Sequence, residues 1–145
     1  MRPVGQTARK FSFSKKEKDD LSVKFRSLLD GENAVQFAYL YGSFLDDLPC
    51  HDIDVGIYVR GIKEEDMTFY GLELGEQFTR EAGCPVDVRV LNNAPVSFLF
   101  HVLKGNLLTE QNSDLHALVI ERTVSRYLDM KPLLLKATRE AFAND

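Results

Sequence analysis

Apolar residues recur at helical spacing in four parts of the chain. Residues 14–30 open with a capping-box pattern, Ser14 followed by Glu17, and continue with one apolar stripe up to Asp30-Gly31, which predicts a helix. Residues 63–82 and the shorter segment 95–104 carry similar stripes, and a long helix is expected from a cap at Ser113 or Asp114 onward. Pro132 is expected to kink or interrupt this last helix. Its inward stripe is expected to consist of Ala117, Ile120, Val124, Tyr127 and Leu128.

Four other segments have the composition of strands. Residues 34–41 are rich in Val, Phe and Tyr and stop at Gly42-Ser43, and residues 52–59 alternate most clearly. Residues 85–91 and 105–110 predict two further strands, and residues 44–50 a short turn or helical connection. The element order α-β-β-α-β-α-β-α indicates an α/β or α+β fold. We expect a tail over residues 1–13 and a single domain over residues 14–145.

The composition is that of an ordinary globular domain. The 145 residues are 44% hydrophobic and 28% charged, which argues against intrinsic disorder. No uncharged run reaches the roughly 18 residues of a membrane span, and the start lacks the apolar stretch of a signal peptide. Cys50 and Cys84 form no disulfide framework and match no metal-binding spacing. A cytoplasmic protein with free thiols and no membrane contact is therefore expected.

The charge is unevenly distributed along the chain. The formal net charge is −4, but residues 1–26 carry +5, residues 27–110 carry −9, and the remainder is neutral. Sequence-independent nucleic-acid binding normally needs a basic surface that neutralises phosphates. The acidic centre therefore argues against strong nucleic-acid binding, but it leaves open an enzyme that handles phosphate through a metal.

Alternation along two strands predicts a cluster of carboxylates. In residues 52–59 the apolar side chains share one face, which leaves Asp52 and Asp54 on the other. In residues 85–91 the same parity leaves Asp87 and Arg89 together. If both apolar faces pack on the same helices, all three aspartates project from one side of the sheet. Such a cluster raises the pKa values of its members unless a positive charge lies between them.

Carboxylate oxygens of this kind suit Mg²⁺, which often completes its shell with substrate phosphates. Two such ions can stabilise the attacking and leaving oxygens of a phosphoryl displacement. Gly42 and Ser43 follow a strand and precede a short connection, so their backbone N–H groups and the Ser43 hydroxyl could face an anion. The ensemble is more specific than any of its parts: strand, Gly-Ser, connection, Asp-x-Asp strand, helix, and a strand with one further Asp.

These residues carry a resemblance to a known superfamily. Tyr41-Gly42-Ser43, Asp52-Ile53-Asp54 and Asp87 within Val86–Val90 resemble the motifs of the DNA polymerase β-like nucleotidyltransferases. Within that superfamily, the small size resembles the minimal nucleotidyltransferases, the MNT or MntA-like antitoxins paired with HEPN-domain toxins. The resemblance covers roughly residues 14–130. It implies a small mixed β-sheet flanked by helices, with a long C-terminal helix.

The resemblance also implies a mechanism. Asp52 and Asp54 would bind two Mg²⁺ ions, and Asp87 would complete the shell of one and help to deprotonate the acceptor hydroxyl. Gly42 and Ser43 would hold the β- and γ-phosphates of ATP. The implied reaction transfers AMP from ATP to a tyrosine of a partner HEPN-type toxin, and this modification silences the toxin. Because the acceptor belongs to another protein, a homo- or hetero-oligomer is also expected.

One segment departs from the family's pattern. Antitoxin members usually place about ten residues between Gly-Ser and Asp-x-Asp, often with an Arg soon after the Ser; here there are eight residues, with Asp46 and Asp47 where the Arg is expected. Acidic residues near an anion site oppose phosphate binding. An alternative therefore stays open: a catalytically degenerate module of the same fold that neutralises its partner by binding alone.

Four further expectations concern packing and surface. Arg89 is expected to form a structural ion pair with a nearby carboxylate, and Gly71 and Gly75 to allow close packing of their helix against the sheet. The basic residues of the first helix are expected to form a solvated face, with the docking of an acidic partner as the alternative. An apolar group near the C-terminus is expected to close the core or the helix end, or to mark a partner surface if exposed. These residues are Lys15, Lys16 and Lys18, and Leu133, Leu134, Leu135 and Phe142.

Overall fold

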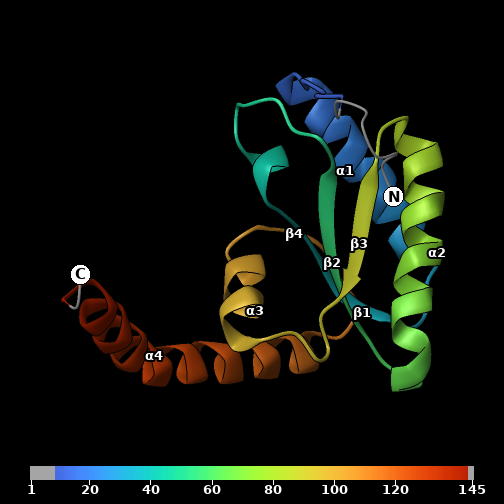
Figure 1. The fold of residues 1–145 in the computed structure, drawn as a ribbon. Helices are drawn as coiled ribbons and strands as arrows, with labels where there is room; N and C mark the ends of the chain where they lie inside the picture. The colour runs from blue at the N-terminus through green and yellow to red at the C-terminus, as the bar shows by residue number, and fades with distance from the viewer. Residues whose placement is uncertain (1–8, 144–145) are drawn as a thin grey trace.

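The computed structural model describes residues 9–143, so the predicted tail lies outside the described residues up to residue 8. The chain forms the predicted order of helices and strands, with one 3-10 turn, η1, in the predicted connection (Figure 1). The elements are α1 (Lys15–Asp30), β1 (Val35–Tyr41), η1 (Ser43–Leu45), β2 (Ile53–Val59), α2 (Glu64–Ala82), β3 (Val86–Val90), α3 (Val96–Leu103), β4 (Asn106–Glu110) and α4 (Ser113–Ala143). The capping box of α1 is present: Glu17 N–H donates to Ser14 Oγ, and Ser14 N–H donates to Glu17 Oε1.

The four strands form one mixed sheet in the order β3-β2-β1-β4. β1 pairs antiparallel with β2 and with β4, whereas β2 and β3 run parallel. Helices cover both faces: α1 and α2 lie on one side of the sheet, and α3 and α4 on the other (Figure 1). The predicted fold, a small mixed sheet flanked by helices with a long C-terminal helix, is confirmed.

Each face of the sheet has its own hydrophobic cluster. On the α1/α2 face, alternate residues of β2 from Ile53 to Val59 pack with Phe25 of α1 and Phe78 of α2. On the other face, Phe37 and Tyr39 of β1 pack with residues of α3 and α4. Because β1 lies in the interior of the sheet and is covered on both faces, its residues from Phe37 to Tyr41 form a continuous buried run and not an alternation.

Helix α2 packs unusually close to the edge strand β3. A Cβ atom at Gly71 would lie 2.9 Å from the Val88 carbonyl oxygen, and one at Gly75 would lie 3.2 Å from the Val86 carbonyl oxygen. Both distances are shorter than ordinary van der Waals contact. A side chain at Gly71 would force the backbone apart, and one at Gly75 would require a shift of a few tenths of an ångström. The expected close packing is confirmed, and it fixes where the outer surface of β3 lies.

The buried face of α4 differs from the predicted stripe. The helix begins after Asn112, whose Oδ1 accepts the Leu115 N–H at 3.1 Å, so the cap is neither Ser113 nor Asp114. Its buried residues are His116, Val119 and Thr123. Of the predicted stripe, Ile120, Val124 and Tyr127 are half-buried, whereas Ala117 and Leu128 are exposed.

The physical reason is a polar residue in the buried face. His116 Nε2 lies 2.7 Å from the Tyr39 hydroxyl and His116 Nδ1 lies 2.8 Å from Glu110 Oε1, while its ring packs on Phe37 at 4.3 Å between centroids. Burial of the imidazole is compensated by these two partners. The predicted stripe consisted of apolar and aromatic residues, so it did not include a buried histidine.

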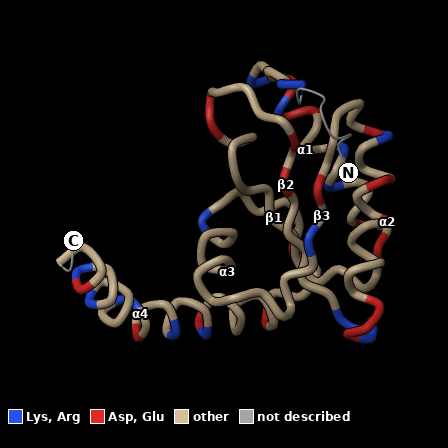
Figure 2. Tube along the Cα trace, in the orientation of Figure 1, with Lys and Arg blue, Asp and Glu red and all other residues tan. Residues whose placement is uncertain are grey.

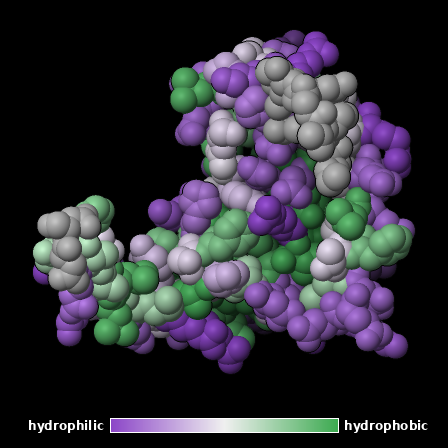
Figure 3. All heavy atoms as spheres, in the orientation of Figure 1, coloured by the Kyte–Doolittle hydropathy of each residue, from purple (hydrophilic) through white to green (hydrophobic). Residues whose placement is uncertain are grey.

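The C-terminal part of α4 was expected to close the core, but it does not. The helix continues through Pro132 without interruption and reaches away from the sheet, with a bend toward its end (Figure 1). Leu133 and Phe142 are 69% and 74% exposed, and Leu134 and Leu135 are also exposed. Apolar atoms accordingly appear along this helix in Figure 3. None of the helices within residues 9–143 is long and apolar enough to cross a membrane.

Candidate active site

Strand pairing brings the predicted site residues to one end of the sheet. The last residue of β1, Tyr41, lies opposite Asp54 of β2, so Gly42 and Ser43 follow directly beside Asp54. Asp54 is in turn paired with Asp87 of β3 in the parallel register. The acidic positions of β2 and β3 therefore lie side by side (Figure 2). Asp52 comes just before β2, in the bend that leads into the strand.

The electrostatics of this cluster centre on Asp54. Burial raises the pKa of its carboxyl to about 6, and the negative charges of Asp52 and Asp87 add to this effect, while Arg89 opposes it. Burial and the Asp54 charge also raise the pKa of the neighbouring Tyr41 hydroxyl. The folded chain therefore holds a concentration of negative charge that a cation would relieve.

Asp87 is held by a basic side chain of its own strand. Arg89 Nε donates to Asp87 Oδ2 at 3.1 Å, and both side chains are partly exposed. The guanidinium of Arg89 also lies over the ring of Phe98 in α3, 5.6 Å from its centroid. The expected ion pair of Arg89 is thus confirmed, and its partner is one of the predicted catalytic carboxylates.

Gly42 explains how the Gly-Ser turn and the carboxylate come so close. Its φ is +83°, a conformation that residues with a side chain rarely adopt. A Cβ atom there would lie 2.6 Å from Asp54 Oδ2. Any other residue at this position would displace the carboxylate. Ser43, which begins η1, is exposed at the same end of the sheet.

The connection after η1 is held by a lysine that the sequence analysis assigned to a solvated face. Lys18 of α1 donates from Nζ to the Asp46 carbonyl oxygen at 2.6 Å, and its ammonium lies 5.6 Å from the centroid of the Phe44 ring. Cys50 pairs through its backbone with Phe11. Lys18 therefore contacts the segment that departs from the family's pattern, through an exposed hydrogen bond. No spacing within the sequence links residue 18 to residue 46, so only the fold reveals this contact.

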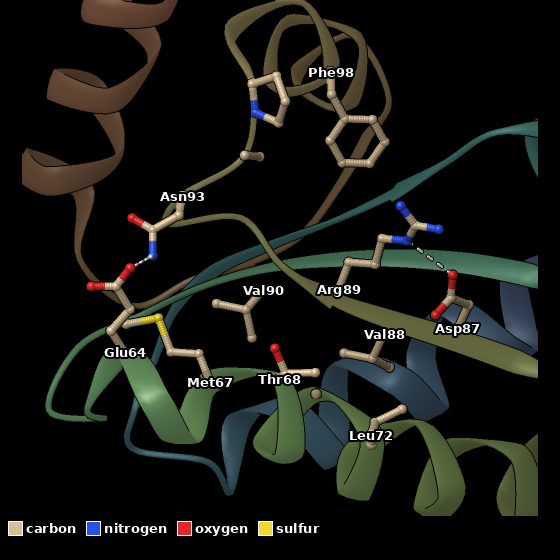
Figure 4. A pocket seen from close by; sticks show the side chains of 13 residues that line it. Glu64, Met67, Thr68, Leu72, Asp87, Val88, Arg89, Val90, Asn93 and Phe98 are labelled. Carbon is tan, nitrogen blue, oxygen red and sulfur yellow. Dashed lines mark hydrogen bonds and ion pairs between the residues drawn. The ribbon is translucent and has the colours of Figure 1, made fainter.

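A groove opens beside Asp87, between α2, β3 and α3. Its volume is about 660 Å³. Met67, Thr68 and Leu72 of α2 form one wall, and Phe98 of α3 lies across from them (Figure 4). At one end Asn93 donates to Glu64 at 3.2 Å; Asp87 and Arg89 stand at the other end. This groove could not be predicted from the sequence, because it depends on how three separate elements, α2, β3 and α3, pack around one another.

The donor set fits a hard divalent cation in its chemistry, since it consists of carboxylate oxygens whose charges repel one another. Within residues 9–143, however, no three His, Cys, Asp or Glu side chains are gathered as a formed metal centre. Asp87 faces Arg89 in this arrangement. A bound cation would therefore compete with the Arg89 guanidinium for the Asp87 carboxylate.

Comparison with known families agrees with this geometry. The model of the family described as "Polymerase beta, Nucleotidyltransferase" matches residues 24–114, which include Gly42, Ser43 and the three aspartates. The chain belongs to the polymerase β nucleotidyltransferase family. A search of curated protein sequences finds no significant match.

Several solved structures share the fold. A chain of the complex between the tri-AMPylated HEPN toxin of Shewanella oneidensis and an MNT antitoxin superposes with a TM-score of 0.62 at 22% identity, covering 88% of this chain and 97% of that one. A chain of the toxin–antitoxin complex MntA–HepT gives a TM-score of 0.58 at 20% identity, with coverages of 91% and 97%. A toxin–antitoxin structure with AMP-PNP gives 0.59 at 21% identity, with coverages of 92% and 98%. At such identities the likeness establishes the fold.

Proposed function

We propose that this chain is an Mg²⁺-dependent adenylyltransferase that transfers AMP from ATP to a hydroxyl, most simply that of a tyrosine, on a partner HEPN-type toxin, and so acts as an antitoxin. The observation that carries the proposal is the placement of Asp54 between Gly42 on one side and Asp87 on the other. The proteins with the same fold support it, since they are described as an MNT antitoxin with a tri-AMPylated HEPN toxin and as a toxin–antitoxin with AMP-PNP.

Each predicted residue receives a role in this proposal. Gly42 and Ser43 hold the β- and γ-phosphates of ATP. Asp52 and Asp54 would hold two Mg²⁺ ions, with Asp87 as a further ligand of one. The ions, when bound, supply positive charge that neutralises the phosphates and the developing negative charge.

The reaction is an in-line displacement at the α-phosphorus. The acceptor hydroxyl oxygen forms a bond to that phosphorus while its proton passes to the Asp87 carboxylate. The bond between the α-phosphorus and the oxygen that bridges to the β-phosphate breaks. Pyrophosphate leaves, and AMP remains on the acceptor as a phosphodiester.

A protein partner is supported by the surface of α4. The exposed apolar side chains in its C-terminal part are the kind of residue that is buried when two proteins associate. We therefore propose a hetero-oligomer in which part of this helix contacts the toxin. The alternative is a module that neutralises its partner by binding alone, and the connection with Asp46 and Asp47 is the feature that favours it.

One experiment separates the two functions. The chain is mixed with its HEPN partner, Mg²⁺ and ATP that carries the label either in its α-phosphate or in its γ-phosphate. The proposal predicts that only the α-label enters the partner, and that the variant with Asp52→Ala and Asp54→Ala binds the partner without labelling it. If the unmodified protein transfers no label but still silences the toxin, the binding module is correct. Transfer of the γ-label would indicate a kinase instead.

A further inference from the structure

The groove between α2, β3 and α3 adjoins Asp87, and the proposed mechanism gives it no occupant. It lies on the outer side of β3, which is the edge strand of the sheet. We propose that this groove is the acceptor site: it receives an aromatic, hydroxyl-bearing side chain, a tyrosine of the partner protein, and delivers its oxygen to Asp87. This inference rests on the proposed transfer of AMP.

The in-line geometry of the proposed displacement requires the acceptor to approach from the β3 side of the sheet. The Gly42 turn, Asp54 and Asp87 follow one another across β1, β2 and β3. With the β- and γ-phosphates at the Gly42 turn, the leaving oxygen points toward β1. An in-line displacement requires the attacking oxygen to approach from the opposite side, which is the side of β3. The groove begins there, at Asp87.

The walls of the groove favour an aromatic acceptor. Met67 and Leu72 of α2 and Val90 of β3 face the ring of Phe98 across the groove (Figure 4). In the space-filling view, apolar atoms are exposed near the middle of this face (Figure 3). An aromatic side chain buries 150–250 Å² and gains most from such walls, whereas a serine side chain would leave them in contact with water. The volume of about 660 Å³ exceeds what one side chain needs, so neighbouring residues of the partner also fit.

The two ends of the groove set the orientation of the acceptor. The end away from the reaction centre is lined by Asn93 and Glu64, which are joined by a hydrogen bond. At the other end Arg89 spans Phe98 and Asp87, so the polar groups gather where the hydroxyl would lie. A second hollow of about 550 Å³ shares Leu72 and Asp87 and continues along β3 to Asp52. The partner chain can therefore enter along the outside of β3 while its hydroxyl points at Asp87.

The inference separates acceptor binding from ATP binding, and one residue pair tests this separation. Leu72 lines the groove and is 60% exposed. Phe69 lies on the same helix and is 63% exposed, but it faces a different hollow, beside Glu32 and Ile62. Leu72→Glu and Phe69→Glu thus each replace an apolar side chain by a carboxylate at similar exposure, and neither residue belongs to the two hydrophobic clusters.

The test measures initial rates of AMP transfer to the HEPN partner at varied partner concentration and, separately, at varied ATP concentration. A carboxylate in the apolar wall should raise KM for the partner about ten-fold or more in Leu72→Glu, because it must be desolvated when the aromatic side chain enters. KM for ATP should stay within about two-fold, and Phe69→Glu should match the unmodified protein in both constants. Thermal melting of both variants verifies that they fold equally well.

Two results would overturn the acceptor site. One is a rise in KM for ATP in Leu72→Glu, which would assign the groove to the nucleotide. The other is equal behaviour of the two variants toward the partner, while the unmodified protein transfers AMP. Absence of any transfer by the unmodified protein would overturn the proposed function, and the acceptor site with it.

Discussion

Replacing Asp54 by asparagine should abolish AMP transfer and yet make the metal-free protein more stable at neutral pH. Asp54 is half-buried between two other carboxylates, and its pKa of about 6 lies above the ordinary value of 3.8. A raised pKa means that the folded protein binds this proton more tightly than the unfolded chain does. The free energy of unfolding therefore falls as the pH rises from 3.8 to about 6, and the full loss persists above that range.

The size of the effect follows from the pKa difference. The difference between a pKa of about 6 and one of 3.8 corresponds to about 3 kcal/mol, because a tenfold change in proton affinity is worth about 1.36 kcal/mol. Partial exposure of the cluster and screening by salt reduce this upper bound to about 1 kcal/mol. Asparagine has almost the same shape, so it removes the charge without opening a cavity. A gain of about 1 kcal/mol raises the melting temperature of a domain of this size by roughly 3–5 °C.

The assay is thermal melting of the two proteins in a chelator from pH 4 to pH 8. The melting temperature of the variant should be close to that of the unmodified protein near pH 4. The variant's advantage should increase between pH 4 and 6 and stay constant above pH 6. Addition of Mg²⁺ should stabilise the unmodified protein more than the variant, because the ion binds the folded state through this carboxylate. A variant that melts at or below the temperature of the unmodified protein at pH 8 would refute the account of the acidic cluster.

Three other substitutions test separate parts of the structure. Gly42→Ala places a Cβ where a carboxylate oxygen lies and forces an unfavourable φ, so transfer should fall at least ten-fold; a variant with normal kcat/KM would contradict this role. Lys18→Met removes the donor to the Asp46 carbonyl but keeps the apolar stem, so hydrogen exchange across residues 44–50 should accelerate; unchanged protection would mean that the lysine does not hold this connection. Tyr39→Phe leaves His116 buried without one partner and should cost about 1–3 kcal/mol in denaturant titration, with transfer kinetics unchanged; a loss below about 0.5 kcal/mol would show that the contact contributes little.

The strand patterns were sufficient to predict the acidic cluster. Parity within residues 52–59 and 85–91 placed the acidic residues on one face, and the register of the sheet pairs Asp54 with Asp87. Period-two alternation is a local property, so it can be read without knowledge of the fold. The turn at Gly42 could likewise be located, but not the reason for its glycine, which is the approach of the Asp54 carboxylate.

Features built from distant parts of the chain could not be predicted. The groove depends on how close α2 lies to β3, and Gly71 permits this approach because it has no Cβ to meet the Val88 carbonyl oxygen. The buried face of α4 was misjudged because His116 is satisfied by residues of β1 and β4, and a single sequence does not show which polar side chain will find such partners. The position of Lys18 over the connection was missed for the same reason.

The most direct test of AMP transfer to a partner protein is the intact mass of that partner. The HEPN-type protein is incubated with this chain, ATP and Mg²⁺, and the intact masses of both proteins are then measured by mass spectrometry. The partner should gain the mass of one or more AMP units, the gain should map to a tyrosine, and Asp54→Asn should abolish it. A folded partner that binds this chain and keeps its original mass would contradict the account.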